Sequence, residues 1–111
     1  MAHVEVGTFT QAATAIAVNV SCGFSPSYVK IINVTDGDTM EWFRGMTDAH
    51  GLKSLAGTAN QLKLTAVTAN GITPSGDGAA DTFKGFTFGL DTDINIASKV
   101  YRWVALLETG G

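Results

Sequence analysis

Apolar and polar side chains alternate with a period of two residues in several parts of this chain, and this period predicts short β-strands. Threonine, valine, isoleucine and aromatic residues are frequent in the same parts, and these residue types favour strands. The segments that we expect to form strands are 13–22, 28–34, 39–44, 61–67, 85–90 and 99–107.

Three of these segments carry more detailed predictions. Residues 28–34 have apolar side chains on both faces, so we expect a central strand or one that a neighbour covers on its outer face. In residues 39–44, Met40 and Trp42 should lie on one face and Phe43 on the other. Residues 13–22 contain alanines that would also suit a helix, although the Val-Asn-Val-Ser end favours a strand.

Turn-forming residues separate the predicted strands. Residues 23–27 contain Pro26, which cannot donate to a strand ladder, and Asp36-Gly37 and Asn70-Gly71 are both typical of tight hairpins. Residues 46–53 are less regular and predict either a loop or one helical turn. Residues 74–81 are polar and rich in glycine, which predicts a flexible loop.

These elements together indicate an all-β fold. About seven short strands separated by turns are typical of an antiparallel β-sandwich or a jelly-roll-like barrel. A length of 111 residues suits one domain spanning 1–111. Residues 1–10 are a candidate N-terminal arm that becomes ordered on a neighbouring molecule.

The last quarter of the chain predicts a closing hairpin. A strand at 85–90 leads into an acidic turn around Asp91 and Asn95, and a second strand follows at 99–107. Tyr101 and Trp103 are two residues apart and therefore lie on the same face of that second strand.

The charge of the chain limits its partners. Charged residues make up only 15% of the sequence, against about 25% in typical soluble domains. The net charge is −3 and the basic residues are scattered, so we expect no nucleic-acid partner. The N-terminus lacks the basic start and apolar core of a signal peptide, and apolar runs are too short to span a membrane. We therefore expect synthesis in the cytoplasm and no membrane partner.

The acidic turn invites comparison with a calcium-binding loop. Asp91, Asp93 and Asn95 match the first positions of such a loop, but Ile96 stands where a glycine is needed and Arg102 where a glutamate is needed. We therefore expect Asp91 and Asn95 to bond the backbone of their own turn. No metal ligand and no cofactor is predicted for this chain.

Catalytic motifs are absent from the sequence. His3, His50 and the single cysteine, Cys22, lie in unrelated segments, and no serine stands in a nucleophile elbow. Cys22 follows an apolar run, so we interpret it as a small buried residue. These observations predict that the protein is not an enzyme.

Aromatic residues offer two interpretations. Trp42, Phe43, Tyr101 and Trp103 could stack on a sugar ring, because sugars bind flat aromatic faces. The simpler interpretation is that they pack in the core or at a protein interface.

Two segments resemble small all-β structural proteins of tailed bacteriophages. The first is 23–33, a Gly-Phe-x-Pro turn that leads into an apolar strand ending in asparagine, and the second is the segment from Gly85 to the Gly-Gly end of the chain. The resemblance covers about a third of the chain. It implies a capsid decoration (cement) protein, located on the capsid surface of the virion and made in the host cytoplasm.

Such a role implies specific partners. A decoration protein would bind the major capsid protein and would itself form a dimer or trimer that follows capsid symmetry. Two other hypotheses remain open: a tail- or head-fibre adhesion module that binds a host glycan, and a cellular β-sandwich of unrelated role. The residues that we expect at an interface are Phe9, Trp42, Phe43, Tyr101 and Trp103.

Overall fold

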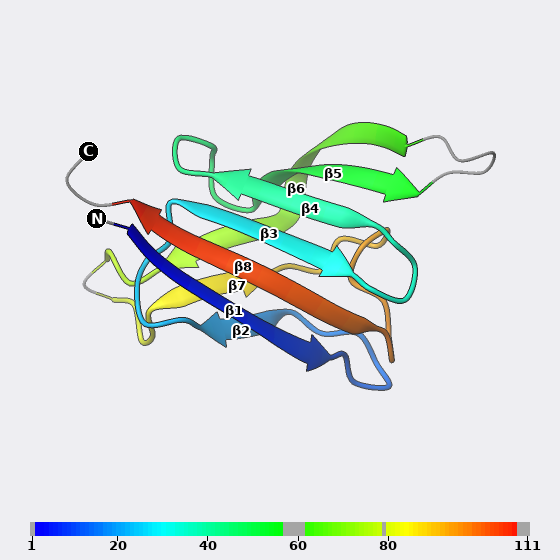
Figure 1. Ribbon diagram of the computed structural model, residues 1–111, viewed down its shortest axis with the longest axis horizontal. Coiled ribbons are helices and arrows are strands. Elements are labelled where there is room, and N and C mark those ends of the chain that lie inside the picture. The colour runs from blue at the N-terminus through cyan, green and yellow to red at the C-terminus, as the bar shows by residue number, and fades with distance from the viewer. Residues whose placement is uncertain (1, 57–61, 79, 109–111) are drawn as a thin grey trace.

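The computed structural model describes residues 2–56, 62–78 and 80–108, and these residues form an all-β fold (Figure 1). No helix occurs in the described parts of the chain, so they contain no helix that could cross a membrane. The eight strands are β1 (Ala2–Thr10), β2 (Val18–Ser21), β3 (Tyr28–Asn33), β4 (Thr39–Phe43), β5 (His50–Ala56), β6 (Leu62–Ser75), β7 (Gly85–Phe88) and β8 (Val100–Glu108).

The strands form one sheet in the order β1-β8-β3-β4-β5-β6-β7-β2, and every neighbouring pair is antiparallel. The sheet curls into a half-barrel whose two edges are β1 and β2, and no ladder joins these edges (Figure 1). The expected all-β, barrel-like or sandwich-like fold class is thus confirmed.

Aromatic contacts show how far the sheet curls. Four strands lie between β7 and β8 in the sheet order, yet Phe86 lies 5.5 Å from Trp103 and Phe88 lies 5.6 Å from Tyr101, measured between ring centroids. The predicted closing hairpin is therefore wrong: the two strands pack face to face across the core. Burying both sets of rings against each other removes more apolar surface from water than a flat hairpin would.

The core fills the concave face of the sheet. Trp42 and Tyr101 are almost fully buried there, together with apolar side chains from β2, β3, β4, β6, β7 and β8. The buried members include Val29, Ile31, Met40, Ile72, Phe86 and Phe88. As predicted, Met40 and Trp42 lie on one face of β4 and Phe43 on the other, and the structure shows that the face of Met40 and Trp42 is the buried one.

Three other local predictions need correction. Residues 46–53 contain no helical turn, because β5 begins at His50 and pairs with both β4 and β6. Of residues 13–22, only Val18–Ser21 are in a strand. Asn70 has the positive φ of 60° expected for Asn-Gly, but it bends the long strand β6 instead of closing a hairpin. Before the bend β6 pairs with β5, and after it Ile72 pairs with both His50 of β5 and Phe88 of β7, from which point β6 continues along β7.

The candidate N-terminal arm is an edge strand. From Ala2 to Thr10 the chain pairs residue by residue with β8. Phe9 stacks on Tyr101 at 5.1 Å between ring centroids, so the end of this strand packs against the core.

The loop between β7 and β8 is held to the loop between β1 and β2 by buried amides. The Gln11 side chain donates to the side-chain oxygen of Asn95 and to the carbonyl of Ile16, and Asn95 donates to the carbonyls of Ile16 and Gly89. These bonds close the end of the half-barrel at which β1 ends and β8 begins.

The Tyr101 hydroxyl fixes the same loop from inside the core. It accepts a hydrogen bond from the Ile96 amide at 2.7 Å and donates to the Ile94 carbonyl at 2.5 Å. Burial raises the pKa of this phenol above its ordinary value, so it stays neutral and able to donate.

Replacing Tyr101 by phenylalanine should lower the free energy of unfolding by about 1–3 kcal/mol, because the Ile96 amide would lose its partner in a buried site. Urea denaturation measures the loss. Tyr28→Phe is the matched control: its hydroxyl bonds Glu41 on the half-buried outer face, so a smaller loss is expected. Equal losses in the two variants would contradict this role of Tyr101.

Candidate functional site

The most unusual surface of the protein is the convex face of β1, β8, β3 and β4. No described element covers it, although many of its side chains are apolar. Five of the eight large apolar side chains exposed among the described residues lie on it: Val4, Val6, Ile32, Phe43 and Val100. Together with the half-buried Tyr28, Val104 and Leu106 they form what we call the convex patch.

Strand register arranges the convex patch in rows across the sheet. The first row is wholly apolar or aromatic, since Val4 lies opposite Leu106, Leu106 opposite Tyr28, and Tyr28 opposite Phe43. The Tyr28 and Phe43 rings are 5.0 Å apart between centroids. Opposite residues on one face of a sheet lie close enough to make a continuous surface. Val6 and Val104 extend this surface into the next row.

Two of the charged residues on the convex face have opposite signs and neighbouring positions. Lys30 lies directly opposite Glu41 in the second row, and Glu41 accepts a hydrogen bond from the Tyr28 hydroxyl at 2.7 Å. Partial burial and this carboxylate raise the pKa of the Tyr28 phenol above its ordinary value, so it remains a neutral donor. A surface with matched charges can be buried against a partner at a smaller desolvation cost than one with unpaired charges.

Two hollows mark the convex patch. One of about 520 Å³ lies at the end of the apolar row, lined by Ser27, Tyr28, Phe43, Arg44, Leu106 and Glu108. The other, about 260 Å³, lies near the β1 edge and is lined by Val6, Lys30, Ile32, Arg102, Trp103 and Val104. Hollows of this kind can receive the projecting side chains of a partner.

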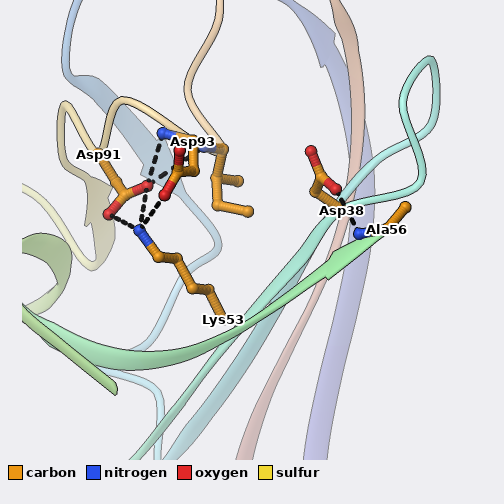
Figure 2. A network of polar contacts seen from close by, with 6 residues as sticks. Asp38, Lys53, Ala56, Asp91 and Asp93 are labelled. Atoms are coloured by element: carbon orange, nitrogen blue, oxygen red, sulfur yellow. Dashed lines mark hydrogen bonds and ion pairs between the residues drawn. The ribbon is translucent and has the colours of Figure 1, made fainter. Parts of the chain in front are cut away.

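A cluster of charged side chains lies away from the convex patch, on the concave side of the sheet (Figure 2). The Lys53 ammonium reaches from β5 to the β7–β8 loop, where it contacts both Asp91 carboxylate oxygens at 3.0 and 3.2 Å and Asp93 at 2.7 Å. Lys53 and Asp91 are buried, whereas Asp93 is exposed. Burial lowers the pKa of Lys53, but its hydrogen bonds to Asp93 and Asp91 outweigh this effect, and the net pKa is raised.

The predicted role of Asp91 in its own turn is confirmed. Its carboxylate accepts hydrogen bonds from the backbone amides of Asp93 and Ile94, at 2.9 and 3.2 Å. The Asn95 side chain bonds the backbone of its own loop at the Gly89 carbonyl and also the neighbouring loop at the Ile16 carbonyl, while its backbone amide donates to the Asp91 carbonyl. Lys53 could not be predicted from the sequence as the partner of this turn, because the two segments are far apart along the chain.

We expect calcium to leave the melting temperature unchanged, since an added cation would have to displace the Lys53 ammonium from between two carboxylates. Thermal melts with calcium and with a chelator make the comparison. A calcium-dependent rise that Asp93→Ala abolishes would contradict this expectation.

Cys22 and His50 contact different segments in the described parts of the chain. Cys22 donates to the carbonyl of Phe24, and burial raises the pKa of its thiol. His3 lies against the ring of Phe24, while His50 bonds the carbonyl of Asp48 in a different loop. No group of three histidine, cysteine or acidic side chains among the described residues is placed to hold a metal ion.

The expected interface residues divide between the core and the surface. Trp42 and Tyr101 are core residues, 2% and 0% exposed, and cannot anchor a partner in this conformation. Phe9 and Trp103 are half-buried and pack against the core. Phe43, 45% exposed, is the one member that lies on the convex patch.

The other residues of the convex patch were not predicted from the sequence as surface residues. The signal was present in β1 and β8, where apolar residues occupy alternate positions at Val4 and Val6 and, except at Arg102, from Val100 to Leu106. Such alternation normally identifies the buried face of a strand, and here it occupies the opposite face.

Comparison with known proteins finds no family model, curated protein or solved structure that matches this chain.

Proposed function

We propose that this protein is a virion structural protein that decorates a bacteriophage capsid, docking on the major capsid protein through the convex patch. The observation that carries the proposal is the uncovered apolar row formed by Val4, Leu106, Tyr28 and Phe43. Contiguous apolar surface on a small domain usually marks a protein contact, because leaving it in water is unfavourable.

The physics of a capsid lattice suits this surface. A decoration protein repeats the same contact many times, so a modest affinity for each copy is sufficient when neighbouring copies are linked. The low charged fraction of 15% reduces the cost of burying the surface. The resemblance of residues 23–33 and of the C-terminal quarter to phage structural proteins supplies the context. In that context the protein would be made in the host cytoplasm and located on the virion.

Binding to undecorated capsids tests the proposal. Purified protein is mixed with capsids that lack it, the capsids are sedimented, and the bound fraction is measured. Phe43→Ser should reduce the apparent affinity by about tenfold or more, since buried aromatic residues are frequent binding anchors.

Leu90→Ser provides the matched control. Leu90 is 42% exposed, close to the 45% of Phe43, but it lies in the β7–β8 loop away from the convex patch. It should bind as the unmodified protein does. Absence of binding by the unmodified protein would overturn the decoration role, and equal binding by both variants would remove the convex patch from it.

An adhesion module that binds a host glycan is the second candidate, and the larger hollow favours it. Tyr28 and Phe43 offer ring faces there, while Arg44, Glu108 and Ser27 offer hydrogen-bonding groups beside them. A glycan screen distinguishes the two roles. Arg44→Ala combined with Glu108→Gln should abolish glycan binding while leaving an apolar contact with capsids largely intact.

A further inference from the structure

The free edge of β1 is a second surface able to bind. The Gln11 amide donates to the Lys99 carbonyl at the end of the β1–β8 ladder. In an antiparallel ladder the bonded positions alternate, so Phe9, Gly7 and the other odd-numbered residues direct their backbone groups toward β8. The even-numbered residues of β1 therefore direct their amides and carbonyls away from the sheet.

β1 lacks most of the features that protect a strand edge. It is nine residues long, without proline, lysine or arginine, and its only acidic residue is Glu5. Val4 and Val6, on its convex side, are 58% and 65% exposed. The opposite edge strand, β2, has only four residues. A long, regular, apolar edge pairs readily with another strand, whereas a very short edge does not.

We propose that β1 pairs with β1 of a second copy of this chain, antiparallel, about a two-fold axis that passes through Val6. The inference deepens the proposed function, on which it rests for its purpose, by identifying the homo-oligomer as a dimer and locating its interface. Val6 is the midpoint of β1, so this register pairs the whole strand, with each even-numbered pair exchanging two backbone hydrogen bonds.

The side chains of β1 are self-complementary in this register. On the convex side Val6 meets its own copy and Val4 meets Thr8, so β-branched residues lie opposite each other. On the concave side Glu5 lies opposite Gly7, which keeps the two Glu5 carboxylates from facing each other. The two convex patches then join across the axis into one surface twice as wide, which would face a capsid lattice.

Trp103 gives the concave side a specific contact. Its indole lies directly over Gly7, so close that a Cβ there would be 2.7 Å from the indole nitrogen. Among the described residues this nitrogen has no hydrogen-bond partner. In the dimer the Glu5 carboxylate of the second copy lies opposite Gly7 on the same face, within reach of this N–H donor.

The mass of the protein alone in solution tests the pairing without any capsid. Sedimentation equilibrium should give a dimer that dissociates on dilution. Val6→Lys places two ammonium groups opposite each other at the axis and should raise the dissociation constant by at least about tenfold. Val100→Lys is the matched control, because Val100 is an exposed valine on the same convex face but within the interior strand β8. It should remain a dimer.

Cysteine substitutions test the register. In an air-oxidised sample Val6→Cys should form a disulfide-linked dimer, since residue 6 faces its own copy at a distance that a disulfide can span. Val4→Cys or Thr8→Cys alone should not cross-link, whereas a mixture of the two should. Cys22 is buried in the unmodified protein, which serves as the uncross-linked reference.

A monomer at all concentrations would overturn the inference. So would a dimer that Val6→Lys leaves intact, or cross-linking by Thr8→Cys alone, because each places the interface elsewhere or changes its register. Circular dichroism of Val6→Lys confirms that the variant is folded. These results are independent of capsid binding. A dimer that does not bind capsids would contradict only the decoration role, and a monomer that binds capsids would contradict only the β1 pairing.

Discussion

Replacing Lys53 by methionine should lower the free energy of unfolding by about 3–5 kcal/mol, the range measured when one partner of a buried ion pair is removed. Methionine keeps most of the side-chain volume but leaves the buried Asp91 carboxylate without its cation. Because Lys53 links β5 to the loop between β7 and β8, which are distant from β5 in sequence, the loss should appear in global unfolding. Urea denaturation followed by tryptophan fluorescence measures it.

Asp93→Asn is the matched control for this substitution. Asp93 contacts the same ammonium at 2.7 Å, but its side chain is 50% exposed, so its loss should cost less than about 1 kcal/mol. The double variant Lys53→Met/Asp91→Asn should recover part of the stability, since no uncompensated buried charge remains. If Lys53→Met proved no more destabilising than Asp93→Asn, the ion pair would have no role in stability.

The contribution of Lys53 should depend on pH only in the alkaline range. The folded-state pKa of Lys53 is raised above its ordinary value of 10.5, so its stabilising effect is complete below that value and is lost as the pH rises through the folded pKa. The stability difference between the unmodified protein and Lys53→Met should therefore be constant from neutral pH to about pH 10 and shrink above it. A difference that already shrinks between pH 7 and 9 would contradict the raised pKa.

Gly85→Ala should destabilise the protein by about 3 kcal/mol, at the upper end of the range for overpacking. A Cβ at Gly85 would overlap the backbone carbonyl of Val20 in the neighbouring strand β2, and the Cys22 amide lies 3.1 Å away. Both obstacles are backbone atoms, so no side-chain rotation can relieve the contact. We expect β2 to detach first, with faster hydrogen exchange at its amides.

Gly78→Ala separates this effect from the general cost of adding a methyl group. Its Cβ would meet only the flexible carboxylate of Asp81, at 3.3 Å, in an exposed turn. The stability should change by no more than about 0.5 kcal/mol. Similar losses for the two variants would show that the approach of β2 to Gly85 is not tight.

Local geometry in this protein was determined by the sequence itself. Alternation placed Met40 and Trp42 on one face of their strand and Phe43 on the other, and Asp36-Gly37 marked a turn where Gly37 has a φ of 86°. The Asx turn at Asp91 was equally visible. Each of these features depends on residues within a few positions of one another. Their local conformational preferences favour the same structure that the complete fold contains.

Only the tertiary structure decided how distant strands meet. β7 and β8 looked like a hairpin because they follow each other, but their aromatic faces are buried only when the strands lie on opposite sides of the core. The pairing of Lys53 with Asp91 follows from the same curl, which brings β5 beneath the β7–β8 loop.

The candidate site was hidden from the sequence for a related reason. Alternation in β8 reveals that the two faces of the strand differ, yet both faces carry apolar residues, Tyr101 and Ala105 on one and Val104 and Leu106 on the other. Which face is buried depends on the direction in which the whole sheet curls. That direction is set by the strand twist and by the packing of all eight strands, so no single segment could reveal that the convex patch would remain uncovered.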